Sequence, residues 1–336
     1  MVAAPMPADL PRTSCVIGVD LGGTKLLAGV VDPDLSVRHR IRRQAFGLDQ
    51  ARLMATIVEA VEEARAAVDE EVTAVGFGIP VTLDRRTGMA VYSTHLPLAD
   101  VAFETVMSER LGLPVTVDND GNCAVLAEAR HGAGGGSGDV VMLTLGTGIG
   151  GGLVLGGQLQ RGWIGAGAEL GHMVIDMDGP PCQGHCPNRG CLEVMASGSA
   201  LVREASLRVA RRPDTPLGHA LEEGRELTGP FVTELAHDGD PVARDAIETV
   251  GRALGVGLAS LVNILNPEVI VIGGGVIAAG EMLLDPARRE MRERALPPAR
   301  DAVRIVAAAF GDEAGMIGAA LMAREAAPGG SRGAGS

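Results

Sequence analysis

Two regions of this sequence repeat one local pattern, in which a buried strand leads through a glycine-rich turn into another strand. In the first region the turn Leu21–Lys25 separates the apolar runs 15–20 and 26–31. In the second region the turn Gly146–Gly151 follows the apolar run 140–145 and leads into a predicted strand. Short apolar runs bounded by glycine are typical of buried strands. The repeat therefore predicts two related α/β halves.

Apolar periodicity and turn residues predict the remaining organisation of the chain. We expect further strands at 37–45, 72–79, 115–118, 152–155, 269–272 and 303–308. We expect helices at 51–68, 101–111, 120–131 and 312–325, a mostly helical stretch over 198–266 and a helix after Gly275. The glycine-rich stretch 132–138 divides an N-terminal lobe, 14–132, from a C-terminal lobe, 133–312, and residues 1–13 and 327–336 are predicted disordered tails.

Charge and hydropathy exclude several classes of partner. The formal net charge is −13, and an acidic chain repels a phosphate backbone, so we expect no nucleic-acid partner. The longest apolar runs, 253–265 and 269–280, are shorter than the roughly 20 residues that span a bilayer. The first 14 residues have neither a basic start nor an apolar core, unlike a signal peptide. We therefore expect a cytoplasmic protein without a membrane partner.

Three glycine clusters directly follow predicted strands, at 22–23, 146–151 and 273–275. Glycine allows backbone N–H groups to converge on an anion without a Cβ in the way, so three such clusters predict a nucleotide site that includes Gly146, Thr147, Gly148, Gly273, Gly274 and Gly275. The sequence has no phosphate-binding loop of the form G-x-x-x-x-G-K-[ST]. The G-x-G-x-x-G match within 146–151 leads into a strand instead of the required helix, which disfavours a dinucleotide-binding fold.

The first glycine cluster is the most specific of the three, because it combines several chemical groups. Asp20 at the strand end can hold hydrated Mg²⁺, which binds through few carboxylates and many waters. Gly22 and Gly23 can surround phosphates, while Thr24 and Lys25, the single lysine of the chain, add hydrogen-bond donors. The alternative is a simple hairpin with a surface lysine.

A run of polar residues over 117–122 follows a predicted strand and opens a helix. Aspartate and asparagine are favoured at a helix N-cap, but a cap requires only one of them. Asp120, at a strand end, is a candidate general base. The neighbouring amide of Asn119 could orient a hydroxylated substrate.

One histidine and three cysteines form a candidate metal site: His172, Cys182, Cys186 and Cys191. A set of one imidazole and three thiolates predicts a closed, tetrahedral, structural zinc site. His185 is a competing ligand. Glu169 and Glu193 flank the site in sequence, so a bound metal could position both carboxylates.

Together these motifs resemble the ROK family, the sugar kinases and related repressors of the actin/hexokinase superfamily, and within it the bacterial glucokinases. The resemblance runs from about residue 15 to 325, and its motifs are Asp20–Lys25, Asn119-Asp120, Leu145–Gly151, Glu169–His172 and Gly190–Glu193. It implies two ribonuclease-H-like lobes with a cleft between them, the helix at 313–325 packing back on the first lobe. It also implies a homodimer or homotetramer that acts in glycolysis.

The resemblance further implies ATP-dependent phosphorylation of D-glucose at its 6-hydroxyl, with Mg²⁺ as cofactor. ATP would lie against the three glycine clusters, and the sugar would contact Asn119, Asp120, Glu169, His172 and Glu193. Asp120 would accept the proton of the attacking hydroxyl.

Two positions depart from the family pattern. The first two cysteines are further apart than in Cys-x-Cys-Gly-x-x-Gly-Cys, and His95-Leu96-Pro97 stands where glucokinases often have Asn-Leu-Pro. Other acceptors therefore remain open: N-acetylmannosamine, N-acetylglucosamine, fructose or allose, as does polyphosphate in place of ATP. A repressor would need an N-terminal helix-turn-helix of some 60 residues or more, whereas about 14 residues precede the first predicted strand.

Overall fold

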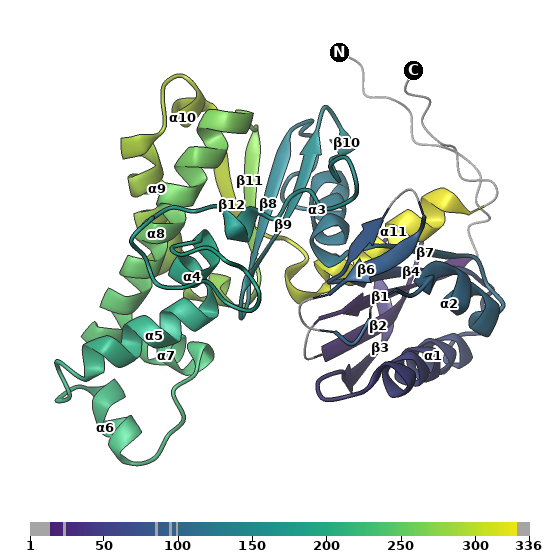
Figure 1. Cartoon of the computed structure of the whole chain (residues 1–336), viewed down its shortest axis with the longest axis horizontal. Coiled ribbons are helices and arrows are strands. Elements are labelled where there is room, and N and C mark those ends of the chain that lie inside the picture. The colour runs from purple at the N-terminus through teal and green to yellow at the C-terminus, as the bar shows by residue number, and fades with distance from the viewer. Residues whose placement is uncertain (1–13, 23–24, 85–86, 94–95, 99, 328–336) are drawn as a thin grey trace. The chain divides into compact units, whose positions relative to one another are not determined.

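The computed structural model describes residues 14–22, 25–84, 87–93, 96–98 and 100–327 (Figure 1). Contacts divide the chain into two compact units. The first unit contains the chain up to Glu128 together with Arg161–Gly167 and the stretch from Glu313 onward. The second unit contains Ala129–Gln160 and Ala168–Asp312. Gly23, Thr24, His95 and nearly all of the two predicted tails lie outside the described residues.

The first unit is built on a five-stranded sheet of order β3-β2-β1-β4-β7. Its strands are β1 (Cys15–Leu21), β2 (Lys25–Val31), β3 (Val37–Gln44), β4 (Val72–Ile79) and β7 (Val115–Asn119). The first three strands form an antiparallel meander, whereas β4 and β7 run parallel to β1. A separate two-stranded sheet, β5 (Thr82–Asp84) and β6 (Met89–Tyr92), follows β4.

The helices of the first unit cover the two faces of this sheet (Figure 1). They are α1 (Gln50–Ala66), α2 (Phe103–Leu111), α3 (Asp120–His131), whose last residues belong to the second unit, and α11 (Ala314–Ala326). Side chains alternate along β1, so Ile17 and Val19 join the core under α1, while Val16 joins Ala320 and Ala323 of α11. The sheet is therefore buried on both faces.

Glycine permits α11 to approach the sheet closely. A Cβ at Gly76 would come far closer than 3.0 Å to the carbonyl oxygen of Ala319, and a Cβ at Gly18 would do the same to that of Met316. Backbone atoms of the helix thus lie directly on the strands, where any larger residue would overpack.

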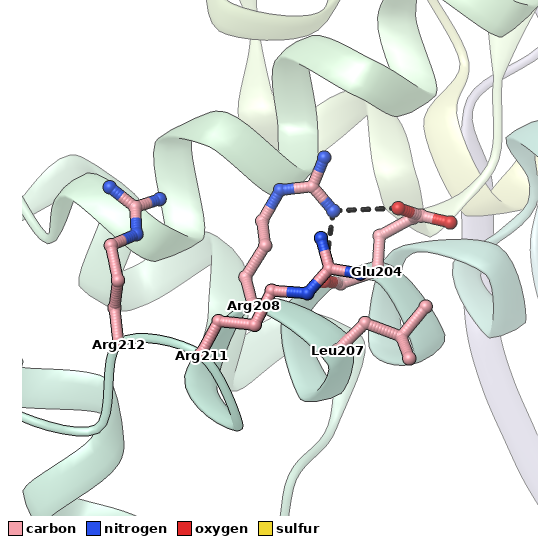
Figure 2. A pocket seen from close by; sticks show the side chains of 5 residues that line it. All are labelled: Glu204, Leu207, Arg208, Arg211 and Arg212. Atoms are coloured by element: carbon pink, nitrogen blue, oxygen red, sulfur yellow. Dashed lines mark hydrogen bonds and ion pairs between the residues drawn. The ribbon is translucent and has the colours of Figure 1, made fainter.

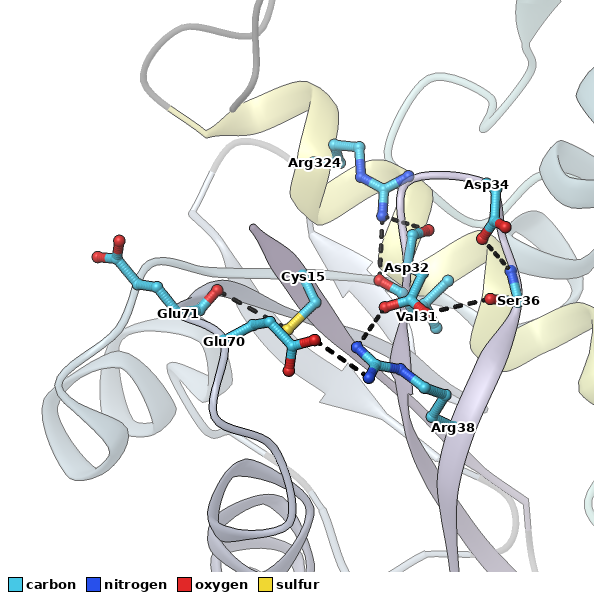
Figure 3. Close-up of polar contacts among 9 residues, drawn as sticks. All are labelled: Cys15, Val31, Asp32, Asp34, Ser36, Arg38, Glu70, Glu71 and Arg324. Carbon is cyan, nitrogen blue, oxygen red and sulfur yellow. Dashed lines mark hydrogen bonds and ion pairs between the residues drawn. The ribbon is translucent and has the colours of Figure 1, made fainter. Parts of the chain in front are cut away.

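A polar network anchors the end of α11 to the turn between β2 and β3 (Figure 3). The Arg324 guanidinium donates to the carbonyl oxygens of Val31 and Asp32, at 3.1 and 2.8 Å. Burial lowers the pKa of Arg324. Asp32 in turn accepts from Arg38, at 2.6 Å, and from Ser36. These contacts hold the last turn of the helix in the first unit.

The second unit has a five-stranded sheet of order β10-β9-β8-β11-β12, the same order as the first sheet in equivalent positions. Its strands are β8 (Val140–Leu145), β9 (Ile149–Leu155), β10 (Gln158–Leu159), β11 (Val269–Gly273) and β12 (Arg304–Ala307). Here too the first three strands form an antiparallel meander and the last two run parallel to β8. Two copies of one ribonuclease-H-like topology therefore make up the chain, as predicted.

A layer of helices covers the second sheet (Figure 1). Its helices are α4 (Leu192–Ala196), α5 (Gly198–Val209), α6 (Pro216–Glu222), α7 (Gly229–His237), α8 (Pro241–Leu265), α9 (Glu281–Arg294) and α10 (Ala299–Ala302). Short 3₁₀ helices are η1 (Leu170–His172), η2 (Gly275–Ala279) and η3 (Gly311–Glu313). The boundary between the two units falls within η3. By length and composition α8 could cross a membrane, but 61% of its most apolar window is buried, and it is the core helix of this unit.

The structure corrects two details of the predicted elements. The strand after the second glycine turn begins at Ile149, not at 152, because Ile149 pairs with Leu145 and closes a tight hairpin. The glycines at 273–275 lead first into the 3₁₀ helix η2, and α9 begins only at Glu281. The short strands β5, β6 and β10 were not predicted, because they lack a long apolar run.

Candidate active site

The polar run 118–122 forms the junction between β7 and α3 in the first unit. The Asn119 Oδ1 atom accepts from the backbone N–H groups of Gly121 and Asn122, at 2.9 and 3.3 Å, so Asn119 caps the helix. Asp120 is the first residue of α3, and its Oδ1 accepts from the N–H of Gly121 at 2.9 Å. The carboxylate of Asp120 is therefore held at a helix N-terminus, where the helix dipole favours negative charge.

Asp118 stabilises the junction between β7 and α3 through its carboxylate. Its Oδ1 accepts from the N–H of Asn119 and from Nδ2 of Asn122, both at 2.8 Å. Its Oδ2 pairs with Nε of Arg161 at 2.5 Å, and only 8% of the Asp118 side chain is exposed. The ion pair thus connects the Arg161–Gly167 segment to the residue that orients Asn119 and Asn122. Sequence reasoning missed Arg161, because no local pattern marks a partner 43 residues away.

A cavity of about 280 Å³ lies beside Asn119 in the first unit. Its lining residues are Leu83, Asp84, Gly88, Glu104, Val117, Asp118, Asn119, Arg161 and Gly165. Burial raises the pKa of Glu104 in this lining. The mixture of carboxylates, one guanidinium and one amide makes a polar cavity, suited to a ligand with hydroxyl groups.

Asp20 and Asp120 lie in one neighbourhood of the first unit. Burial raises the pKa of Cys123 well above its ordinary value, and the nearby carboxylates of Asp118, Asp20 and Asp120 raise it further. Asp20 is the next-to-last residue of β1 and faces the first turn of α11, where a Cβ at Gly315 would lie 2.7 Å from the Asp20 carboxyl carbon. The predicted Mg²⁺ ligand and the predicted base are therefore brought together by the sheet.

The first glycine turn is described only in part. The N–H of Gly22 donates to the carbonyl oxygen of Lys25 at 2.8 Å, which closes the hairpin between β1 and β2. Lys25 is exposed at the start of β2. Gly23 and Thr24, in the middle of this turn, lie outside the described residues.

The second glycine turn is held by three neighbours in the second unit. The Glu193 Oε2 atom accepts from the N–H of Ile149 at 2.9 Å, and a Cβ at Gly148 would collide with this carboxylate. The N–H of Gly198 donates to the carbonyl oxygen of Gly146, and the Ser199 hydroxyl donates to that of Thr147, both at 2.8 Å. The turn therefore rests on Glu193 and on the first residues of α5.

The third glycine cluster packs against the end of β8, next to the second. Gly274 has φ 82°, a left-handed conformation that favours glycine, and a Cβ there would collide with the backbone of Leu145. The structure thus gathers the predicted phosphate-binding residues 146–148 and 273–275 at one end of the second sheet.

The predicted metal ligands cluster as expected. One ligand atom from each of His172, Cys182, Cys186 and Cys191 lies within 4.8 Å of the others. The Sγ atoms of Cys186 and Cys191 are 3.9 Å apart, and Cys182 Sγ is 3.6 Å from Nδ1 of His172. Tetrahedral zinc with Zn–S bonds of about 2.3 Å requires sulfur atoms about 3.8 Å apart, so the donor set fits zinc.

The cluster does not include His185, the competing ligand, and it contains a thiol with a raised pKa. His185 is exposed and does not belong to the cluster. Burial and the neighbouring thiols raise the pKa of Cys191 to about 12, so this thiol stays protonated unless a bound metal ion displaces its proton to solvent.

The predicted sugar ligands of the second unit lie around this cluster. Cys182 Sγ is 4.0 Å from Oε1 of Glu193. Burial raises the pKa of the Glu169 carboxyl even though part of the side chain meets solvent, His172 lowers it, and Glu193 raises it further. Glu169, His172 and Glu193 are therefore close enough to interact.

Comparison with known proteins extends these observations over the whole chain. The model of the ROK family matches residues 16–326. A glucokinase of Streptomyces coelicolor is 36% identical over 318 residues, which cover 93% of this chain and 98% of that protein. A xylose repressor of Caldicellulosiruptor bescii is 27% identical, covering 91% of this chain and 77% of the repressor.

A solved structure shares both the fold and the sequence pattern. The crystal structure of a ROK family glucokinase from Streptomyces griseus, in complex with glucose and AMPPNP, has a TM-score of 0.83 and 36% identity. The match covers 93% of this chain and 99% of the Streptomyces griseus chain. The predicted actin/hexokinase-type fold is thereby confirmed.

Proposed function

The chain belongs to the ROK family, and we propose that it is a glucokinase, which transfers the γ-phosphoryl group of ATP to the 6-hydroxyl of D-glucose. The observation that carries this proposal is the match, over nearly the full length, to glucokinases, one of which binds glucose and AMPPNP. The polar and glycine residues that such chemistry requires are present in both units.

We assign the general base to Asp120. The glucose 6-hydroxyl oxygen attacks the γ-phosphorus, its proton passes to the Asp120 carboxylate, and ADP leaves with the electrons of the broken bond. The N–H of Gly121 and the N-terminus of α3 keep this carboxylate oriented. Catalysis of phosphoryl transfer is chiefly positioning and charge stabilisation, which the Asp118–Arg161 pair supports by fixing the junction.

We assign the nucleotide phosphates to the glycine turns, namely Gly22, Gly23, Thr24 and Lys25 in the first unit and Gly146–Gly148 and Gly273–Gly275 in the second. Backbone N–H groups at such turns bind phosphate oxygens. Asp20 would hold Mg²⁺ through its waters, and the ion would neutralise charge on the phosphates. The carboxylate of Asp20 faces the first turn of α11, where the helix dipole interacts favourably with negative charge.

We assign the sugar hydroxyls to Asn119 and Asp120 in the first unit and to Glu169, His172 and Glu193 in the second. A structural zinc ion would bind His172, Cys182, Cys186 and Cys191. Because Nδ1 of His172 faces the cysteines, its Nε2 is left to meet a sugar hydroxyl. The ion would supply rigidity and no chemistry, since four protein ligands leave no position for water.

The wider setting follows from the same proposal. The reaction would open glucose catabolism in the cytoplasm, as the first step of glycolysis, with a homodimer or homotetramer as the active form. Another hexose, an N-acetylhexosamine or a polyphosphate donor would keep the same base and the same turns.

An assay with several acceptors and donors tests the proposal. We expect the largest kcat/KM for D-glucose with ATP and Mg²⁺, because a site built to pair hydroxyls discriminates against a sugar that leaves buried groups unpaired. Asp120→Asn should lower kcat by about 10²–10⁴ and change glucose binding less than about tenfold. The matched control is Asp238→Asn, an exposed aspartate of the second unit, which should keep full activity.

Two results would overturn these assignments. A larger kcat/KM for an N-acetylated hexosamine than for glucose would replace the acceptor. Near-normal kcat in Asp120→Asn would remove Asp120 from the role of base.

A further inference from the structure

A basic pocket lies at the C-terminal end of α5, in the second unit (Figure 2). It has a volume of about 380 Å³ and is lined by Glu204, Leu207, Arg208, Arg211 and Arg212. Three arginines around one small cavity are unusual in a chain with a net charge of −13. None of these residues belongs to the proposed active site.

The guanidinium groups of this pocket retain many unused donors. Arg208 donates to the backbone and carboxylate oxygens of Glu204, at 3.0 and 2.6 Å, and to the Thr249 hydroxyl at 2.6 Å. These bonds use three of its five N–H groups. Arg212 is paired with Asp245 through a single nitrogen. Among the described residues, the Arg211 side chain has no hydrogen bond or ion pair.

Helix stabilisation explains only part of this arrangement. Arg208 lies in the last turn of α5, where a cation interacts favourably with the helix dipole. Arg211 and Arg212 lie beyond the last helical residue. The lining holds three arginines and one carboxylate, that of Glu204, and outside the lining Arg212 pairs with Asp245. The pocket therefore carries an excess of positive charge.

The same helix connects this pocket to the second glycine turn. At its N-terminal end, Gly198 and Ser199 donate to the carbonyl oxygens of Gly146 and Thr147. Near its middle, Arg203 donates to the carbonyl oxygen of Val194, at 2.6 Å, beside Glu193. A shift of α5 would therefore move the turn and the segment that carries Glu193.

We propose that this pocket binds the phosphate group of a small anion and that the bound anion changes nucleotide affinity through α5. Guanidinium groups match a phosphate through paired N–H···O bonds, and Arg208, Arg211 and Arg212 all have donors to offer. The binding step is independent of the proposed function, whereas the coupling rests on the proposed nucleotide role of Gly146–Gly148.

Calorimetric titration with inorganic phosphate tests the binding, with the nucleotide site saturated by a non-hydrolysable ATP analogue. We expect saturable binding of one phosphate, weakened about tenfold in Arg211→Ala and abolished in Arg211→Glu, because each charge-assisted bond contributes strongly. The matched control is Arg110→Ala, an exposed arginine in the last turn of α2, which should bind phosphate like the wild type. Titration with glucose 6-phosphate and with inorganic tripolyphosphate then distinguishes a sugar ester from a chain of phosphates as the source.

Kinetics tests the coupling separately. Phosphate should change the KM for ATP in the wild type and in Arg110→Ala, but not in Arg211→Glu, while kcat without phosphate stays the same in all three. Unchanged phosphate binding in Arg211→Glu overturns the site. A change of oligomeric state in Arg211→Glu without a change in phosphate binding would make these arginines a subunit contact, and the proposal would be wrong.

Discussion

The two units share one sheet topology but differ in how helices pack on it. In the first unit α11 lies against glycines of β1 and β4, so that helix backbone meets strand backbone. In the second unit the core between β8, β11 and α8 consists of apolar side chains such as Leu143, Ile272 and Leu258. One topology thus tolerates two kinds of helix packing, and the two should respond differently to substitution.

The glycine turns Leu21–Lys25 and Gly146–Gly151 also differ in how tightly their neighbours pack against them. Among the described residues, a Cβ at Gly22 would meet only the carbonyl oxygen of Lys25, at 3.6 Å, which is ordinary contact. A Cβ at Gly148 would collide with the Glu193 carboxylate that accepts from Ile149. The second turn is therefore part of a packed structure, whereas the described part of the first is open.

The largest expected effect concerns the packing of α11. Gly76→Ala should lower the free energy of unfolding by about 3 kcal/mol, because the new methyl group overlaps the backbone of Ala319. That loss corresponds to a fall in Tm of roughly 10 °C, measured by calorimetry. Gly275→Ala is the control in the second unit, since a Cβ there meets nothing within 4 Å. Equal Tm values for the two variants would contradict the proposed difference in packing.

The cysteines of the two units provide the next contrast. Cys191→Ser should lose the proposed zinc ion and raise the KM for glucose by roughly 10–100-fold, more than the KM for ATP, because the ion positions His172 and the segment of Glu193. Cys15→Ser is the control: its Sγ contacts the Glu71 carbonyl oxygen, as Figure 3 shows, and a serine hydroxyl can do the same. Metal analysis should find about one zinc per chain in the wild type and in this control. A metal-free wild type with full activity would end the zinc assignment.

Substitution of the turn glycines sharpens the comparison of the two hairpins. Gly148→Ala should weaken glucose binding about tenfold, because the Glu193 carboxylate must leave its bond to Ile149. Gly22→Ala should change it less than about twofold, since its Cβ meets only ordinary contacts. Calorimetric titration with glucose in the absence of nucleotide separates this effect from any loss of ATP binding. Similar losses in both variants would show that the open and the packed turn do not differ.

The smallest expected effect concerns the side-chain contacts between α8 and α9. Burial opposes ionisation of Glu290, but Arg252 and Arg294 outweigh it and hold the pKa of that carboxyl below its ordinary value. A lowered pKa stabilises the fold above the unfolded pKa of about 4.3, and this contribution is lost as the pH falls through the folded value. Glu290→Gln should therefore lower the free energy of unfolding at pH 7 by only about 1 kcal/mol, because both arginines are exposed and solvent weakens their ion pairs. This difference from the wild type should shrink in acid.

Denaturant unfolding at several pH values measures this difference. Glu248→Gln is the control, because both side chains of the Glu248–Arg289 ion pair are exposed to solvent. A loss in Glu290→Gln that stayed constant down to pH 3 would show that packing, not charge, is responsible.

Much of the site could be predicted because its residues lie close together in sequence. Asn119 and Asp120 follow a strand directly, and His172, Cys182, Cys186 and Cys191 have the composition of a zinc site, so local patterns were enough. The position of Asp20 at the end of β1 followed from the apolar run before it. Arg161 could not be found, because its ion pair with Asp118 depends on the path of a segment far away in the chain.

By itself the sequence determined the longer strands, the repeated strand–turn–strand unit and the types of chemical group at the strand ends. These depend on apolar period, glycine and short-range spacing, which act within a few residues. Only the tertiary structure decided how closely α11 meets the glycines of β1 and β4, that Glu193 holds the second turn and that Cys186, not His185, lies in the candidate metal site. Such contacts join residues that no local pattern relates, because the folding of the backbone brings them together.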